Sequence, residues 1–240
     1  MLARLVLDSS KLLRRRGGRA AGLLAVLAGA AAGQQVIDFE TTPGGGVPVD
    51  DGPLDAAYAL GGTFVSFGFD TNEDLLIDSA PRFEARGGNP STENGAYRTG
   101  PGNNLQNDLD LTSTGAGGAW ILRRDLAIDP ILGHDFLIVF SGTLPTHASG
   151  QVWDLDGGPG FYERWRVDAL DVAGQVLAGV DTPFFTSKTA PPVESLDGWP
   201  WEYSFANLAP AIQTIRISYI GTPSPDVGFA FDNIAAFGGE

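Results

Sequence analysis

The sequence contains no cysteine, which excludes several kinds of chemistry. Without thiols there is no cysteine nucleophile, no thiolate metal site and no disulfide framework, so stability depends on a hydrophobic core or on a bound metal. Only two histidines occur, His134 and His147, and their spacing is not that of metal ligands, which argues against zinc of the usual kind. Phosphate-binding glycine motifs are absent as well.

Lysine is nearly absent after residue 32, where only Lys188 remains. Six of the 15 Lys and Arg residues and one of the 29 acids lie in residues 1–32, so the rest of the chain carries a net charge of −19, compared with −14 for the whole. Such a surface repels nucleic acid and anionic membranes and favours divalent cations. We therefore expect no nucleic-acid partner.

Residues 1–32 have the pattern of a signal peptide. A basic region that includes Arg14, Arg15 and Arg16 precedes an apolar run from Ala20 to Ala32, which ends in an A-x-A cleavage pattern. The run has thirteen residues, fewer than the roughly 20 that a membrane-spanning helix needs. A short membrane anchor is the alternative, and the choice between Sec and Tat export stays open. We expect a secreted or cell-surface protein with no transmembrane segment after residue 32.

Short strands dominate the remainder, residues 33–240. Runs of β-branched and aromatic residues bounded by Gly, Pro, Asn or Asp occur throughout, and no helical window follows residue 33. The predicted strands cover 36–40, 63–69, 119–123, 135–140, 163–170, 175–180, 201–205, 213–220 and 227–234. This pattern predicts a single all-β domain, an antiparallel β-sandwich of the jelly-roll type, with long loops near 86–118 and 182–200.

Acidic residues mark both ends of this domain. In Val36-Ile-Asp-Phe-Glu40 the two-residue period places Asp38 and Glu40 on one face, and Asp232 lies in the segment Ala230-Phe-Asp-Asn-Ile234. These two segments resemble the opening and closing strands of secreted jelly-roll modules, including MAM domains and carbohydrate-binding modules. The resemblance implies that the first and last strands lie side by side and that Asp38, Glu40 and Asp232 hold a structural Ca²⁺.

The segment 151–167 carries a second group of acids, Asp154, Asp156 and Glu163. It is not an EF-hand, because Gly158 and Trp165 stand where ligands are required. An irregular calcium loop, an acidic hairpin turn, and a carboxylate pair of a glycoside hydrolase or lyase remain alternatives. This segment, together with 196–201, is similar to exported bacterial β-sandwich proteins of the PEP-CTERM and planctomycete type.

Three aromatic residues, Trp199, Trp201 and Tyr203, share one face at a two-residue period. They would form a stacking strip for sugar rings if they are exposed, and part of the core if they point inward. From these observations we expect an exported, calcium-stabilised, non-catalytic module that binds a polysaccharide or cell-surface glycan or serves a structural role at the cell surface. A carbohydrate-active enzyme that uses the acids of 154–163 is the alternative.

Overall fold

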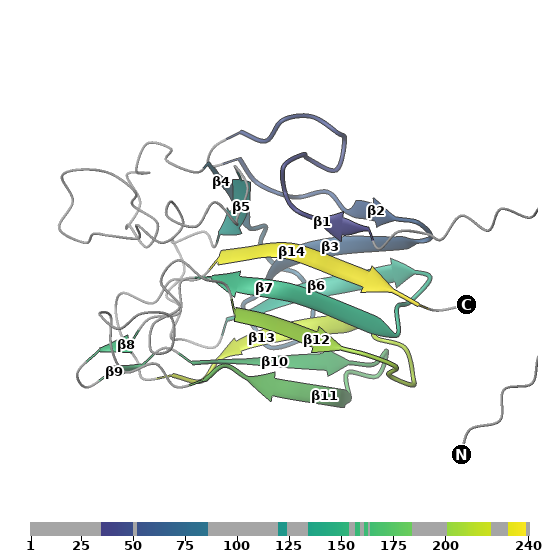
Figure 1. The fold of residues 1–240 in the computed structure, drawn as a ribbon, viewed down its shortest axis with the longest axis vertical. Coiled ribbons are helices and arrows are strands. Elements are labelled where there is room, and N and C mark those ends of the chain that lie inside the picture. The colour runs from purple at the N-terminus through teal and green to yellow at the C-terminus, as the bar shows by residue number, and fades with distance from the viewer. Residues whose placement is uncertain are drawn as a thin grey trace, which may run out of the picture. The chain divides into compact units, whose positions relative to one another are not determined.

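The computed structural model describes the chain in nine stretches. They are residues 35–49, 52–85, 120–123, 134–153, 157–158, 161–162, 164–183, 201–221 and 230–238. Residues 34–240 form one structural unit. The described residues form strands and connecting loops without a helix (Figure 1). No helical span of sufficient length and hydropathy to cross a membrane occurs among them.

Two antiparallel sheets make up the fold (Figure 1). Sheet A runs in the order β12 (Trp201–Phe205), β7 (His147–Trp153), β14 (Ala230–Phe237), β5 (Trp120–Arg123), β4 (Arg82–Ala85), and β1 (Val36–Ile37) also pairs with β14. Sheet B runs in the order β11 (Val176–Asp181), β10 (Trp165–Leu170), β13 (Thr214–Tyr219), β6 (Asp135–Gly142), β3 (Thr63–Asp70), β2 (Tyr58–Leu60). A small separate ladder joins β8 (Gly157–Gly158) and β9 (Phe161–Tyr162).

The core lies between the inner faces of the two sheets. Residues two apart in β6 and in β10 belong to the core, as expected for a strand with one face in a core. They are Phe136, Ile138 and Phe140 of β6 and Trp165, Val167 and Ala169 of β10. Phe136 of β6 stacks on Phe231 of β14, with ring centroids 3.9 Å apart, and so joins sheet B to sheet A. The prediction of an all-β antiparallel sandwich is therefore confirmed.

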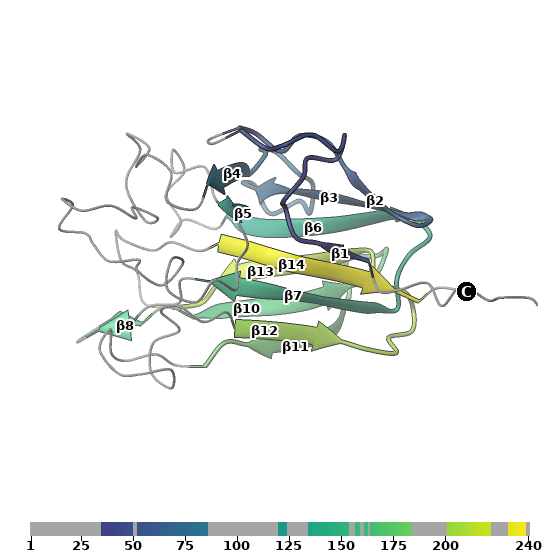
Figure 2. The ribbon, with the colours of Figure 1, turned by 45° about the horizontal axis from the view of Figure 1, so that its top comes forward.

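The first and last strands are neighbours, as expected. β1 pairs antiparallel with β14, with Val36 opposite Ala235 and Ile37 opposite Ile234 (Figure 2). Most predicted strands are present, but β2, β4, β8, β9 and the longer β7 were not predicted. The reason is clearest for β7. Its sequence, His-Ala-Ser-Gly-Gln-Val-Trp, has few β-branched or aromatic residues, and it is a strand because β12 and β14 pair with it on both sides.

Candidate cation site at the junction of the first and last strands

Phe39 fixes the chain immediately after β1. It has a left-handed backbone, with φ +55°, although it is not a glycine, a conformation that costs about 1 kcal/mol or more. Its ring is fully buried and packs edge-on against Tyr58 (5.9 Å between centroids) and Phe67 (5.4 Å). The Tyr58 hydroxyl also donates a hydrogen bond to the carbonyl of Thr41. Phe39 therefore anchors this short segment of the chain, and its two neighbours in sequence, Asp38 and Glu40, both carry carboxylates.

Asp232 lies in β14, beside this segment. Asp232 pairs with Gln151, and the next pair is Ala235 with Ser149. β14 therefore has one more residue than β7 between these two pairs, which is a β-bulge. Asn233, within the bulge, has φ +52° and donates from its side-chain amide to Oε1 of Gln151 at 2.8 Å. Asp232 is only 1% exposed, and its Oδ1 accepts the backbone N–H of Asn233 at 2.7 Å.

The charges of two further carboxylates, Asp38 and Glu40, act on Asp232. The pKa of Asp232 is raised to about 8, mainly by burial and in part by these two negative charges, and the hydrogen bond from the N–H of Asn233 opposes the rise. Asp38 also contributes, after burial, to the raised pKa of Tyr58. An ionised, buried carboxylate close to two others is unfavourable unless a cation compensates it.

Two other aspartates are buried as deeply, and both are compensated. Asp168, 1% exposed, accepts hydrogen bonds from Arg166 Nε and a terminal nitrogen of Arg216, each at 2.9 Å. Asp70, 1% exposed, accepts three backbone N–H groups of the loop that follows it. In the described part of the chain, no arginine or histidine forms an ion pair with Asp232.

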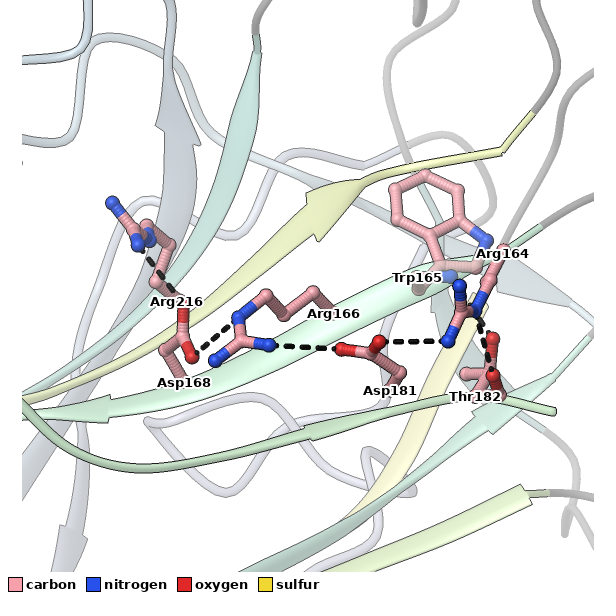
Figure 3. A network of polar contacts seen from close by, with 7 residues as sticks. All are labelled: Arg164, Trp165, Arg166, Asp168, Asp181, Thr182 and Arg216. Carbon is pink, nitrogen blue, oxygen red and sulfur yellow. Dashed lines mark hydrogen bonds and ion pairs between the residues drawn. The ribbon is translucent and has the colours of Figure 1, made fainter.

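Three arginines lie instead on the outer face of sheet B. Figure 3 shows a row of alternating charges across β13, β10 and β11, made of Arg216, Asp168, Arg166, Asp181 and Arg164. The two-residue period of the sequence 163–170 predicts that Arg164, Arg166 and Asp168 share one face, opposite Trp165, and the structure confirms it. The row holds three neighbouring strands together. Because each arginine already binds a carboxylate, we regard the row as structural.

Sequence reasoning missed a further acidic loop, residues 70–78, between β3 and β4. Asp70, Asn72, Asp74 and Asp78 have the alternating spacing with which calcium loops present oxygens. Leu75 has φ +64° at the place where an EF-hand loop carries glycine. The segment Asp-Thr-Asn-Glu-Asp was the signal that could have identified it. In this structure the oxygens of Asp70 accept the loop's own N–H groups.

The remaining predicted ligands have different outcomes. Asp154, Asp156, Glu163 and Trp199 lie outside the described residues. Tyr203 is 2% exposed and belongs to the core, which corrects its assignment to an exposed stacking strip.

The cause of that correction is the orientation of β12, whose alternate residues face inward. The rings of Trp201, Tyr203 and Phe205 follow one another at 6.4 and 6.0 Å between centroids. Trp201, at the start of β12, remains half-buried.

Among the described residues, no three His, Cys, Asp or Glu side chains stand ready in a metal-binding arrangement. Asp232 is fixed by burial, whereas Asp38 is exposed and Glu40 half-buried. One oxygen of Asp38 accepts the backbone N–H of Glu40 at 3.2 Å. An ion at this place therefore requires rotation of the two carboxylates from the β1 side.

Comparisons with known proteins leave the chain without a family. No family model matches it, and no curated protein matches it either. Among solved structures it is similar to the K3 cleaved adhesin domain of Lys-gingipain from Porphyromonas gingivalis, with 12% sequence identity over 49% of this chain and 73% of that chain. The TM-score is 0.31, and a similarity this low says nothing about function.

Proposed function

We propose that this protein is an exported, non-catalytic β-sandwich module in which a structural Ca²⁺ joins the first strand to the last. The observation that carries the proposal is the environment of Asp232. Its carboxylate is 1% exposed, is close enough to Asp38 and Glu40 for their charges to raise its pKa, and has no arginine among its described partners.

The chemistry of the three side chains selects the cation. Carboxylate oxygens are hard ligands, and Ca²⁺ accepts six to eight oxygens in an adaptable geometry, so backbone carbonyls and water complete its shell. Mg²⁺ requires a stricter octahedron and loses its water reluctantly. The surplus of carboxylates in residues 33–240 also attracts divalent cations. The ion would do for this chain, which has no cysteine, what a disulfide does in other exported proteins.

Direct ion binding tests this part of the proposal. Residues 33–240, freed of metal by a chelator, are titrated with Ca²⁺ by calorimetry, and the bound metal is then counted by mass spectrometry after dialysis. We expect Asp232→Asn to remove one ion per chain. The matched control is Asp74→Asn, which removes one carboxylate from the exposed loop 70–78 and should leave that ion in place. Loss of an ion in the control alone would assign it to the loop instead.

For the ligand, we propose a polysaccharide or cell-surface glycan that is bound at Trp199 and Trp201. Trp201 packs against the core beside Tyr203. It supports this assignment because it is only half-buried and lies at the start of β12, which has one neighbour among the described strands of sheet A. A flat aromatic side chain at a sheet edge can stack on a pyranose ring. Glycan-array binding by the native protein, abolished by Trp199→Ala or Trp201→Ala and retained in Phe237→Ala, tests it. Phe237 is an exposed aromatic of the same sheet. Equal binding by all variants would refute it.

A further inference from the structure

Strand β11 forms one edge of sheet B. It pairs with β10 on one side and has no second neighbour among the described strands (Figures 1 and 2). The N–H of Thr182 donates to the carbonyl of Trp165 at 2.8 Å, which sets the alternation of this antiparallel ladder. By that alternation, Gly179 and Asp181 direct their backbone N–H and C=O groups away from β10. These groups are available to hydrogen-bond with an added strand.

This edge lacks the residues that usually protect an edge strand from pairing. Val176–Asp181 contains neither lysine nor proline, and Val176 is 50% exposed. The one charged residue of the strand, Asp181, is held on the outer face by Arg164 at 2.8 Å and Arg166 at 3.0 Å (Figure 3). Its charge is thereby compensated within the protein and does not repel an approaching strand.

Exposed apolar residues occur in the turn that leads into this edge and in a loop that reaches the turn. We define the edge patch as Leu76, Val172 and Val176, which are 63%, 71% and 50% exposed. Loop 70–78 reaches the turn 171–175 because Leu75 packs against Gly174, where an added Cβ would lie 2.9 Å from Cδ1 of Leu75. The patch therefore combines residues from two connections with the first residue of β11.

The patch is held in a fixed conformation. The carboxylate of Asp70 ties down three backbone N–H groups of the loop, and Ile77 packs so closely on Gly68 that a Cβ there would lie 2.1 Å from its Cγ2. Glu73 and Leu75 both have positive φ. A surface that is already ordered loses little conformational entropy on binding.

The charges beside the patch indicate the chemistry of the partner. Glu73, Asp74 and Asp78 are exposed in the same loop, which carries no lysine or arginine. A second copy of this chain would bring the same carboxylates to the interface, and the two copies would repel each other. We propose that β11 and the edge patch bind an extended segment of a partner protein by strand addition, and that this segment carries alternating apolar residues flanked by lysine or arginine.

A synthetic peptide of alternating valine and threonine with a lysine at each end is the probe for this site. It is titrated into residues 33–240 in the presence of calcium, and binding is followed by amide chemical shifts and hydrogen exchange. We expect the largest shifts in 73–78 and 171–181 and at least tenfold slower exchange at the amides of Gly179 and Asp181. A peptide with alternate amides N-methylated cannot extend the ladder and should bind at least tenfold more weakly.

Substitutions on the protein complete the test. Val176→Lys places a charge on the edge, and Leu76→Ser removes the apolar tip of the patch; each should weaken peptide binding at least tenfold. Val47→Ser is the matched control because Val47 is 76% exposed elsewhere, and it should bind as the native protein does. Equal binding of the two peptides, equal loss in the control, or shifts elsewhere would overturn the proposal. So would a dimer in sedimentation that Val176→Lys dissociates, since the occupant would then be a second copy.

Discussion

Replacement of Asp232 by asparagine should raise the free energy of unfolding of the calcium-free protein, whereas most substitutions in a core lower it. The pKa of Asp232 lies near 8 in the folded chain, compared with 3.8 for the unperturbed group. At pH 7.5 its ionisation therefore opposes folding by about 5 kcal/mol. Asparagine has a similar shape and no charge, but its buried amide still costs about 1–3 kcal/mol. The variant should be more stable by roughly 2–4 kcal/mol.

The effect should depend on pH with a defined sign. Because folding raises the pKa of Asp232, the folded chain holds a proton that the unfolded chain releases. The contribution of this proton to the stability of the folded chain is complete below about pH 4 and is lost as the pH rises through about 8. At pH 4 mainly the cost of the buried amide remains, so calcium-free Asp232→Asn should be less stable than the native protein by up to about 2 kcal/mol. The difference should shift in favour of the variant as the pH rises to about 8.

Thermal unfolding followed by circular dichroism, with and without EDTA, provides the assay. For a domain of this size a gain of 2–4 kcal/mol raises the melting temperature by roughly 4–16 °C. Calcium at 10 mM should stabilise the native protein by about 1.5–3 kcal/mol if its Kd is near 10⁻⁴–10⁻³ M, as in extracellular modules. It should not stabilise Asp232→Asn. A variant that is less stable than the native protein by the same amount at pH 4 and pH 7.5 would refute the reasoning.

Four other substitutions test the ion pairs and the packing. Asp168→Ala should lose about 2–3 kcal/mol in urea unfolding because two arginines lose a buried partner, whereas Asp181→Ala, at 29% side-chain exposure, should lose less than about 1 kcal/mol. Gly150→Ala should lose about 1–3 kcal/mol because its Cβ would lie 2.6 Å from both Tyr203 Oη and Ile234 Cδ1. Tyr203→Phe removes a buried hydroxyl without a hydrogen-bond partner in the described structure and should leave stability unchanged or raise it by about 1 kcal/mol.

Local alternation was enough to predict most of the longer strands and the direction of many side chains. In the 163–170 window, the period of two assigned Trp165 and Val167 to one face and Arg166 and Asp168 to the other, and the structure has them so. The same period could not say which face of 201–205 is inward, because aromatic residues suit both a core and a ligand surface. Burial of Tyr203 by the opposite sheet decided it, and that is a tertiary property.

The junction of β1 and β14 could not be predicted from the local sequence pattern alone. That these strands are neighbours followed from a resemblance, since pairing between residues about 200 positions apart has no local signal. The left-handed backbone of Phe39 could not be predicted, because bulky residues do not favour positive φ. Asparagine does tolerate positive φ, but nothing in the local sequence marks a bulge at Asn233. The two features arise from the packing of Phe39 in the core and from the register of β14 against β7. By contrast, the spacing of the acidic residues in loop 70–78 is visible in the sequence, but sequence reasoning missed it.

The shortage of cations in residues 33–240 connects the composition to the proposed ion. Residues 33–240 contain only nine Lys and Arg residues but 28 Asp and Glu residues. Three of the nine, Arg164, Arg166 and Arg216, are bound to carboxylates on sheet B. Asp70 is compensated by backbone N–H groups, which requires a loop that turns back on its own aspartate. Asp232 lies within a central strand, where the ladder to β7 uses the backbone and such a loop cannot form. Below its raised pKa a buried carboxyl in that position is neutral because it holds a proton. Once ionised it needs a compensating charge from elsewhere, and we propose that a cation from solution supplies that charge.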